Sequence, residues 1–293
     1  MEKKKDLQTL ACLMVVLQSV IYGLGDPLAK FAYGYMGVYS LLTVRYSIGF
    51  GIMLLLFGNR IVADLRKSRI KDWILPCICV AGAYLSNNLA LTYTDATVAA
   101  FFRSTSVVAT PLLLFLVRGK RMTLPQGIIM AIAMVGLYLL CCNNGMQSFG
   151  LGEIMGIATA LFSAGAMITS QTAMKHIHSI TLTTMQTMTS MLFAFSGAMI
   201  FDGGVFVGVM PVGIWGIILY LAIVCTLGGY MLQNMALKSI SPRTMSMVKC
   251  ICPVMTACFS FLILGETLMR NGIIGSAMIL VCVLIQTWMK DRD

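Results

Sequence analysis

The chain has 293 residues, of which 58% are hydrophobic and 11% are charged. Soluble domains carry about a quarter charged residues, so this composition excludes an ordinary soluble protein and predicts an integral membrane protein. The net charge of +10 would suit a nucleic-acid partner, but most basic residues fall in tails and connections between apolar stretches, where membrane topology accounts for them. We therefore expect a lipid bilayer, and no nucleic acid, around this chain.

Ten stretches are apolar and long enough to cross the hydrocarbon core of a bilayer, which takes about 20 helical residues. The connections between them are short, and the most polar one covers residues 59–72. The predicted spans are 9–30, 38–58, 73–93, 98–117, 124–142, 151–173, 180–201, 211–236, 244–264 and 271–289. The expected fold class is an all-α integral membrane protein with ten transmembrane helices.

The third and fourth of these stretches return in the second half of the chain. A shift of 146 residues places segment 82–122 on segment 228–268 without a gap and sets Arg103 over Lys249. A shared basic residue inside two matching apolar helices is hard to explain by similar composition, so we interpret the chain as two homologous halves, 1–145 and 146–293. Other matched pairs are Gly82 and Gly228, Tyr84 and Tyr230, Asn88 and Asn234, Thr110 and Thr256, and Gly119 and Gly265.

Lysine and arginine are distributed unequally between the two sides that ten spans would create. Sixteen of them lie in the two tails and alternate connections, whereas only Arg270 lies in the opposite connections. Cytoplasmic loops carry the excess of positive charge, so we predict a multi-pass protein of the plasma membrane with both termini cytoplasmic. Because each half has five spans, the halves must insert in opposite orientations. Many secondary transporters are built on such inverted repeats, with the substrate site between the halves near the midplane.

Four basic residues and one acid fall inside the predicted spans: Lys30, Arg45, Arg103, Lys249 and Asp26. A charge at the centre of a membrane helix costs about 2.5–3.5 kcal/mol on insertion scales, so each charge needs a partner, a water-filled cavity or a route to the surface. Lys30 ends the first span and can reach the surface. Asp26 is expected either to form an ion pair with Arg45 or Arg103 that holds helices together, or to carry a coupling proton.

Arg103 and Lys249 are related by the repeat and enter the membrane from opposite sides. We hypothesise that both contact an anionic group of a substrate, because arginine binds carboxylate or phosphate through two hydrogen bonds and lysine acts as a point charge. A structural role, in which both pair with backbone carbonyls or with Asp26, stays open. The cavity is expected among the first, third, fourth, sixth, eighth and ninth spans.

Amides and tyrosines of the first, third and eighth spans are further candidates for this cavity. Asn88 and Asn234 lie at corresponding positions and are interpreted as substrate-binding, as are the rings of Tyr22, Tyr84 and Tyr230. The alternative for all five is packing between helices, since buried amides also join transmembrane helices by hydrogen bonds.

Enzymatic functions find little support in the sequence. Gly23-Leu-Gly25-Asp26 has the form seen in intramembrane aspartyl proteases, but that chemistry needs a second aspartate in a neighbouring span, and Asp95 and Asp202 fall in connections. The ten cysteines lie mostly inside apolar spans and are interpreted as small buried hydrophobic residues. We expect no enzyme, no cofactor and no metal.

One ordered set of motifs carries a resemblance to a known family. The second repeat ends with Asn234-Met-Ala-Leu237, Pro253 and Gly265-Glu266. The first repeat ends with Asn88-Leu-Ala-Leu91 and Gly119, and the second span contains Arg45. With ten spans in two repeats, this arrangement resembles the EamA-type members of the drug/metabolite transporter superfamily. The first copy departs from it, because Val107 and Lys120 stand where the second copy has Pro253 and Glu266. In some anion-carrying relatives, basic residues of the fourth and ninth spans face the substrate, as Arg103 and Lys249 would.

These features predict a secondary transporter that moves a small polar metabolite across the membrane by alternating access. An anionic or zwitterionic substrate is preferred, such as an amino acid, an organic acid or a phosphorylated metabolite. Coupling to a proton or a counter-substrate and assembly as a homodimer stay open. Two alternatives remain: an exporter of cationic drug-like or amine compounds that uses Asp26, and a non-transporting membrane receptor or subunit.

Overall fold

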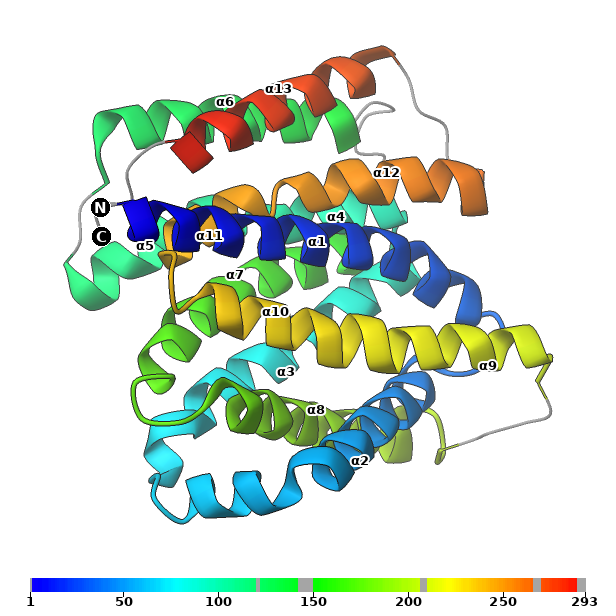
Figure 1. Ribbon diagram of the computed structural model, residues 1–293. Coiled ribbons are helices and arrows are strands. Elements are labelled where there is room, and N and C mark those ends of the chain that lie inside the picture. The colour runs from blue at the N-terminus through cyan, green and yellow to red at the C-terminus, as the bar shows by residue number, and fades with distance from the viewer. Residues whose placement is uncertain (1, 120–121, 142–149, 206–209, 266–269, 289–293) are drawn as a thin grey trace.

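The computed structural model describes residues 2–119, 122–141, 150–205, 210–265 and 270–288. All regular secondary structure in these ranges is helical, and the helices lie roughly side by side in a bundle (Figure 1). The predicted boundary between the halves, at residues 145 and 146, lies outside the described ranges. The helices are α1 (Glu2–Ala32), α2 (Val38–Leu65), α3 (Ile70–Tyr93), α4 (Ala96–Ser104), α5 (Ser106–Arg118), α6 (Leu124–Cys141), α7 (Leu151–Ala173), α8 (Ser179–Phe201), α9 (Val212–Leu219), η1 (Tyr220–Gly228), α10 (Gly229–Ala236), α11 (Pro242–Val248), α12 (Ile251–Leu264) and α13 (Arg270–Trp288).

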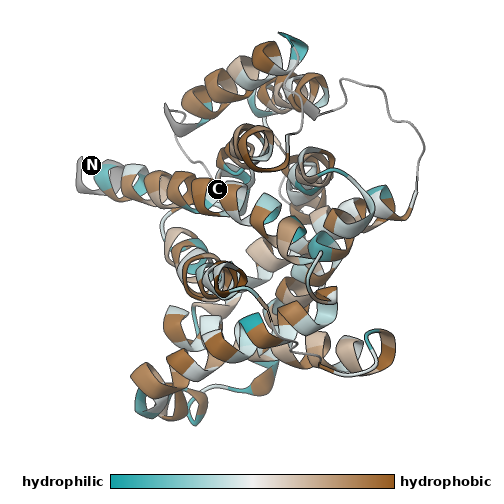
Figure 2. Ribbon diagram, turned by 90° about the vertical axis from the view of Figure 1, so that its right-hand side faces the viewer, coloured by the Kyte–Doolittle hydropathy of each residue, from teal (hydrophilic) through white to brown (hydrophobic). Residues whose placement is uncertain are grey.

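These helices make up ten membrane-spanning segments, as predicted. Seven helical segments are long and apolar enough to cross a bilayer by length and composition, and α6 and α13 contain shorter apolar stretches. The tenth segment is α8, which has 23 residues but is rich in threonine and serine. Large apolar side chains lie exposed on the outside of the bundle, among them Leu55, Leu116 and Leu262. Figure 2 shows hydrophobic residues on helices throughout the molecule. This surface fits lipid rather than water.

The two halves have opposite orientations. The start of α1 and the end of α13 lie at the same end of the bundle (Figure 1). The first half ends with α6 at the opposite end, and the second half begins there with α7. The fold is therefore an inverted repeat of five spans, as the sequence predicts.

The contacts between helices follow the same two-fold relation. α1 packs against α10, η1 and α12 of the second half, and α7 packs against α3, α4 and α5 of the first. Equivalent helices also meet each other, α2 with α8 and α6 with α13. The first span of each half therefore lies between the third and fourth spans of the other half, and this arrangement places polar residues of both halves around one centre.

A glycine in the left-handed conformation ends the fourth span and another ends the ninth. Gly119 has φ 65° and Gly265 has φ 71°, a region that only glycine enters at little cost. The N–H of Gly119 donates to the carbonyl of Phe115 at 2.9 Å, and the N–H of Gly265 donates to the carbonyl of Ser260. The matched glycines of the repeat thus end both helices in the left-handed conformation, although their N–H groups donate four and five residues back, respectively.

The fourth and ninth spans are each interrupted, a feature that the sequence analysis did not predict. The first break lies at Thr105 and the second at Lys249 and Cys250; a shift of 146 residues carries Thr105 to Ile251, next to the second break. Pro253 has no N–H for the carbonyl of Lys249, which accepts instead from the N–H of Cys252 at 2.9 Å. At the first break the hydroxyl of Thr105 donates to the carbonyl of Phe102 at 2.6 Å and competes with the helical pattern.

The eighth span differs from its counterpart by a π-helical segment. η1 covers nine residues between α9 and α10, whereas the third span is one continuous α-helix, α3. Within η1 the hydroxyl of Thr226 donates to the carbonyl of Leu221, five residues earlier, at 3.0 Å. Short π segments inside α-helices are frequently found at functional sites.

Candidate functional site

A cavity lies between the two halves of the molecule, at the centre of the bundle. About 880 Å³ in and around it is not filled by protein atoms, a volume that includes the part open to its surroundings. Its walls come from the six predicted spans and also from the second span. The lining residues are Gln18, Ser19, Tyr22, Gly25, Asp26, Ala29, Arg45, Val80, Ala83, Tyr84, Asn87, Asn88, Arg103, Ser104, Ser106, Thr159, Ser163, Ala166, Leu221, Cys225, Gln233, Lys249 and Cys252.

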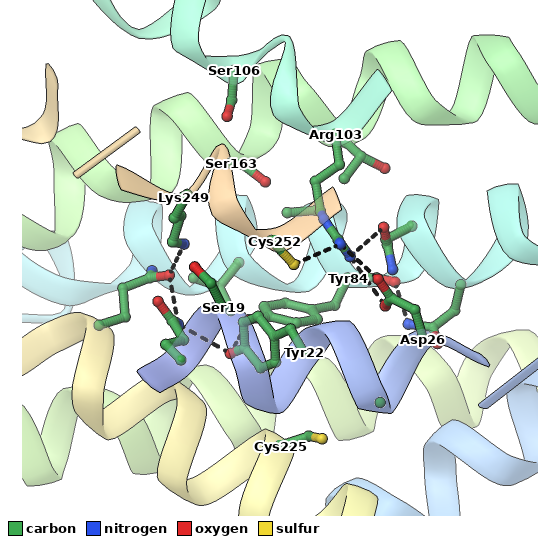
Figure 3. A pocket seen from close by; sticks show the side chains of 18 of the residues that line it. Ser19, Tyr22, Asp26, Tyr84, Arg103, Ser106, Ser163, Cys225, Lys249 and Cys252 are labelled. Carbon is green, nitrogen blue, oxygen red and sulfur yellow. Dashed lines mark hydrogen bonds and ion pairs between the residues drawn. The ribbon is translucent and has the colours of Figure 1, made fainter. Parts of the chain in front are cut away.

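Asp26 and Arg103 form an ion pair on one side of the cavity (Figure 3). The two nitrogens Nη1 and Nη2 of Arg103 donate to Oδ1 and Oδ2 of Asp26 at 3.1 and 2.6 Å. Nη1 also donates to Oδ1 of Asn87 at 3.0 Å, and Nη2 to Sγ of Cys252 at 3.1 Å. Arg103 therefore has partners on α1, α3 and α12. The structure thus pairs Asp26 with Arg103, so Arg103 is not the unpaired cation that one interpretation of the sequence required.

Lys249 lies on the other side of the cavity, at the break in the ninth span (Figure 3). Its Nζ donates to Oε1 of Gln233 at 2.5 Å. An ammonium group has three donors, and no carboxylate among the described residues pairs with this one. Gln18 joins the same group, because its Nε2 lies 3.4 Å from Oε1 of Gln233. Lys249 thus brings an unneutralised charge to the cavity wall.

Arg45 contributes a further cation, from the second span. Only 4% of the residue is exposed, and its Nε donates to Oγ1 of Thr226 in η1 at 2.7 Å. Its guanidinium carbon lies 5.5 Å from the centre of the Tyr46 ring. Arg45 and Arg103 were both candidate partners of Asp26 from the sequence; Asp26 pairs with Arg103, and Arg45 contacts a hydroxyl instead.

Two tyrosines lie between Lys249 and the Asp26–Arg103 pair (Figure 3). The hydroxyl of Tyr84 donates to the hydroxyl of Tyr22, and the two rings meet edge to face with centroids 6.0 Å apart. Both residues line the cavity, so they contribute aromatic and hydroxyl surface to its wall.

The other predicted site residues divide between the cavity and the surrounding core. Asn88 lines the cavity, where its amide nitrogen donates to the carbonyl of Tyr84 and its oxygen accepts from Tyr33. Asn234 is not among the lining residues, because its amide nitrogen donates to Thr183 and to Gln186 of α8. Tyr230 is not among them either. It is 2% exposed and packs against the ring of Tyr84, with centroids 4.7 Å apart.

Several lining residues were not singled out from the sequence. Gln18 is fully buried, and its amide nitrogen also donates to the carbonyl of Gly229 at 2.8 Å. A glutamine in the middle of an apolar span was the available signal. Cys252 was interpreted as a small buried hydrophobic residue, and only the folded structure shows it beside Arg103. Cys225, another lining cysteine, belongs to η1, which no sequence pattern indicated.

The inverted halves, the matching broken helices and the polar cavity between them define a membrane carrier of the inverted-repeat class. Comparison with known families identifies it further. The chain belongs to the EamA-like transporter family, whose model matches residues 9–142 and 150–288. This confirms the resemblance seen in the repeat motifs.

Individual relatives agree with this assignment. An uncharacterized transporter of Bacillus subtilis (strain 168), YyaM, is 23% identical over 292 aligned positions, which cover 93% of this chain and 92% of that protein. A solved crystal structure matches with a TM-score of 0.77 at 15% identity, covering 94% of this chain and 96% of its own. The similarity to this solved structure concerns the fold alone.

Proposed function

We propose that this protein is a secondary transporter of the plasma membrane that moves a small anionic metabolite by alternating access. The observation that carries the proposal is the charge of the cavity. Among the described residues, Arg45, Arg103 and Lys249 line it together with one acid, Asp26, which leaves two of these positive charges without an acidic partner. Such charges are costly to hold inside a membrane unless they serve a pathway or a ligand, and an anion would supply the missing compensation.

Lys249 is the first anchor in this proposal. Its ammonium has a neutral amide as its hydrogen-bond partner, so it gains most from a carboxylate or phosphate. Arg103 already holds Asp26 through two hydrogen bonds. An anion that moves toward Arg103 therefore competes with Asp26 for its guanidinium. The Asp26–Arg103 pair thus opens when substrate arrives, rather than serving as the site that first binds the substrate.

The broken helices supply the movement. Arg103 lies in the last turn of α4, directly before the break at Thr105, and Lys249 lies at the break between α11 and α12. Discontinuous helices near the midplane bind substrate in other inverted-repeat carriers, where one half rocks against the other. The proposal thus assigns this protein transport rather than catalysis, with both termini in the cytoplasm and an exchanged anion or a proton as the coupling partner.

Export of cations through Asp26 is less well supported. Its carboxylate is bound by Arg103 and lies 3.4 Å from the hydroxyl of Thr256, so a cationic substrate would have to displace an arginine in a cavity that is already positive. A receptor or a subunit without transport activity would not need paired breaks in two spans.

The test is uptake into proteoliposomes that contain the purified full-length chain, with a panel of labelled carboxylates, amino acids, phosphate esters and amines. We expect anions to accumulate and amines not to. The variants Lys249→Gln and Arg103→Gln should each lower the initial rate about tenfold or more, the loss expected when a charge-assisted hydrogen bond disappears. Arg60→Gln is the matched control, because Arg60 lies on an exposed part of α2 beside His178. Full transport by both cavity variants, or uptake of amines alone, would refute the proposal.

A further inference from the structure

The cavity holds two cations that no acid among the described residues neutralises. Asp26 and Arg103 form a closed pair with no net charge. Arg45 and Lys249 remain, and neither forms an ion pair within the part of the chain that the structure describes.

Arg45 is the more unusual of the two. The residue is nearly fully buried at 4% exposure, yet only its Nε forms a hydrogen bond, to Thr226. Its Nη1 and Nη2 donate to no group in the described ranges, while the side chain forms part of the cavity wall. A guanidinium remains protonated in proteins and carries five donors in a planar fork. The unused side of this fork can bind a carboxylate or phosphate.

Both cations are attached to the eighth span, at different depths. Arg45 donates to Thr226 and Lys249 donates to Gln233, positions seven residues apart. At 1.5 Å per residue, these two anchor points are about 10 Å apart along the helix. The two cations are therefore held at separate positions along the eighth span.

The aromatic pair of the cavity lies along the stretch that separates them. Gln18 donates both to the hydroxyl of Tyr22 and to the carbonyl of Gly229, which lies between Thr226 and Gln233 in the sequence of the eighth span. The hydroxyl of Tyr84 donates a hydrogen bond to the same hydroxyl of Tyr22. The path from Arg45 to Lys249 thus passes phenol rings and hydroxyl groups, which suit an uncharged or hydroxylated middle of a ligand.

We propose that the substrate carries two anionic groups at opposite ends, one held by Arg45 and the other by Lys249, with its middle against Tyr22 and Tyr84. The inference rests on the proposed function and names its substrate class: a dicarboxylate or a phosphorylated carboxylate. A monoanion or a zwitterion would leave one buried cation without a counter-charge.

Binding to the purified full-length protein in nanodiscs, measured by titration calorimetry, tests this inference. The probes are glutarate and 3-phosphoglycerate, which have two anionic ends, butyrate, which has one, and inorganic phosphate, which concentrates its charge in one group. We expect at least one two-ended probe to bind about tenfold or more tightly than butyrate and phosphate, as one additional charge-assisted hydrogen bond would give. This comparison needs no substitution, so it holds even if a variant fails to fold.

The variants Arg45→Gln and Lys249→Gln then assign the two ends. Each should remove most of the preference for the two-ended probe while changing butyrate binding much less, and Arg45→Lys should restore part of the preference. Equal binding of glutarate, 3-phosphoglycerate and butyrate, or an unchanged preference in Arg45→Gln, would overturn the two-ended substrate while leaving anion transport intact. Binding of no anion by the wild-type protein, together with uptake of none in proteoliposomes, would instead remove the proposed function itself.

Discussion

Asp26 and Arg103 join the first span to the fourth at a depth where their side chains are only 9% and 17% exposed. The ion pair between Lys30 and Asp95 connects the same two parts of the chain nearer the surface, with exposures of 28% and 69%. The two pairs therefore offer a direct comparison of a buried and an exposed ion pair within one molecule.

We expect Asp26→Asn to destabilise the protein by about 3 kcal/mol, because it leaves Arg103 buried without its counter-charge. Asp95→Asn should cost less than about 1 kcal/mol, as exposed pairs do. Thermal unfolding of both variants in the same detergent, followed by circular dichroism, measures the difference. Equal melting temperatures for the two variants would mean that the Asp26–Arg103 pair contributes nothing beyond a surface contact.

The sequence identified the charged residues that lie inside membrane spans, but it did not show which of them form ion pairs with each other. Position along a helix can be counted in residues, and it placed Asp26, Arg45 and Arg103 inside the predicted spans. Direction around the helix axis and the tilt between helices decide which arginine reaches the aspartate, and these depend on packing across the whole bundle. For the same reason Asn88 and Asn234, equivalent in the repeat, have different surroundings: one lines the cavity and the other bonds to α8.

At the scale of single helices, the first span depends on a close approach to the ninth. A Cβ atom added to Gly23 would lie 2.4 Å from Cβ of Met255 and 2.9 Å from its carbonyl carbon, so no side chain fits without moving the backbone. Gly51 in α2 is also helical, but an added Cβ there meets nothing within 4 Å. These glycines therefore separate the effect of packing from that of helix propensity.

Gly23→Val should destabilise the protein by about 1–3 kcal/mol through overpacking and should lower its yield as folded protein, whereas Gly51→Val should leave stability close to that of the wild type. Size-exclusion profiles and thermal unfolding of both variants check this. A Gly23→Val protein that is as stable as the Gly51→Val control would show that α1 can separate from α12 without loss.

The helix breaks illustrate what periodicity cannot detect. Apolar patterns predicted continuous fourth and ninth spans, because apolar residues predominate on both sides of each break. Pro253 gave a local signal for the second break, since it removes the donor that the carbonyl of Lys249 needs. No comparable residue marks the first break, where Pro111 lies six residues beyond Thr105.

At the scale of the whole molecule, the inverted repeat predicts which connections face which side. The connection between α1 and α2 and the one between α2 and α3 lie at opposite ends of the bundle (Figure 1). Tyr35 is 47% exposed in the first connection, and Lys67 is exposed in the second. Cysteines introduced at these two positions therefore report the orientation of the chain.

An impermeant maleimide applied to intact cells should label Tyr35→Cys and should label Lys67→Cys only after permeabilisation, because the excess of positive charge keeps the second connection in the cytoplasm. The unsubstituted chain measures labelling of the native cysteines. The reverse pattern would place both termini outside and contradict the predicted topology.

The fold was predictable to a greater extent than the site because span length, repeat register and charge asymmetry are one-dimensional properties. The number of spans, their duplication and their opposite orientation follow from counting along the chain. The contribution of Arg45 to the cavity does not, because it depends on how α2 approaches η1 of the other half.

The π-helical segment η1 makes the two halves unequal. In a carrier whose halves exchange shapes, perfectly matched repeats would make the outward-facing and inward-facing forms equal in energy. The wider turn around Thr226, which within the described ranges is found in the eighth span alone, removes that equality. The unloaded carrier would then adopt mainly one of the two forms, outward-facing or inward-facing. A ligand would have to bind the rarer form more tightly to reverse this bias.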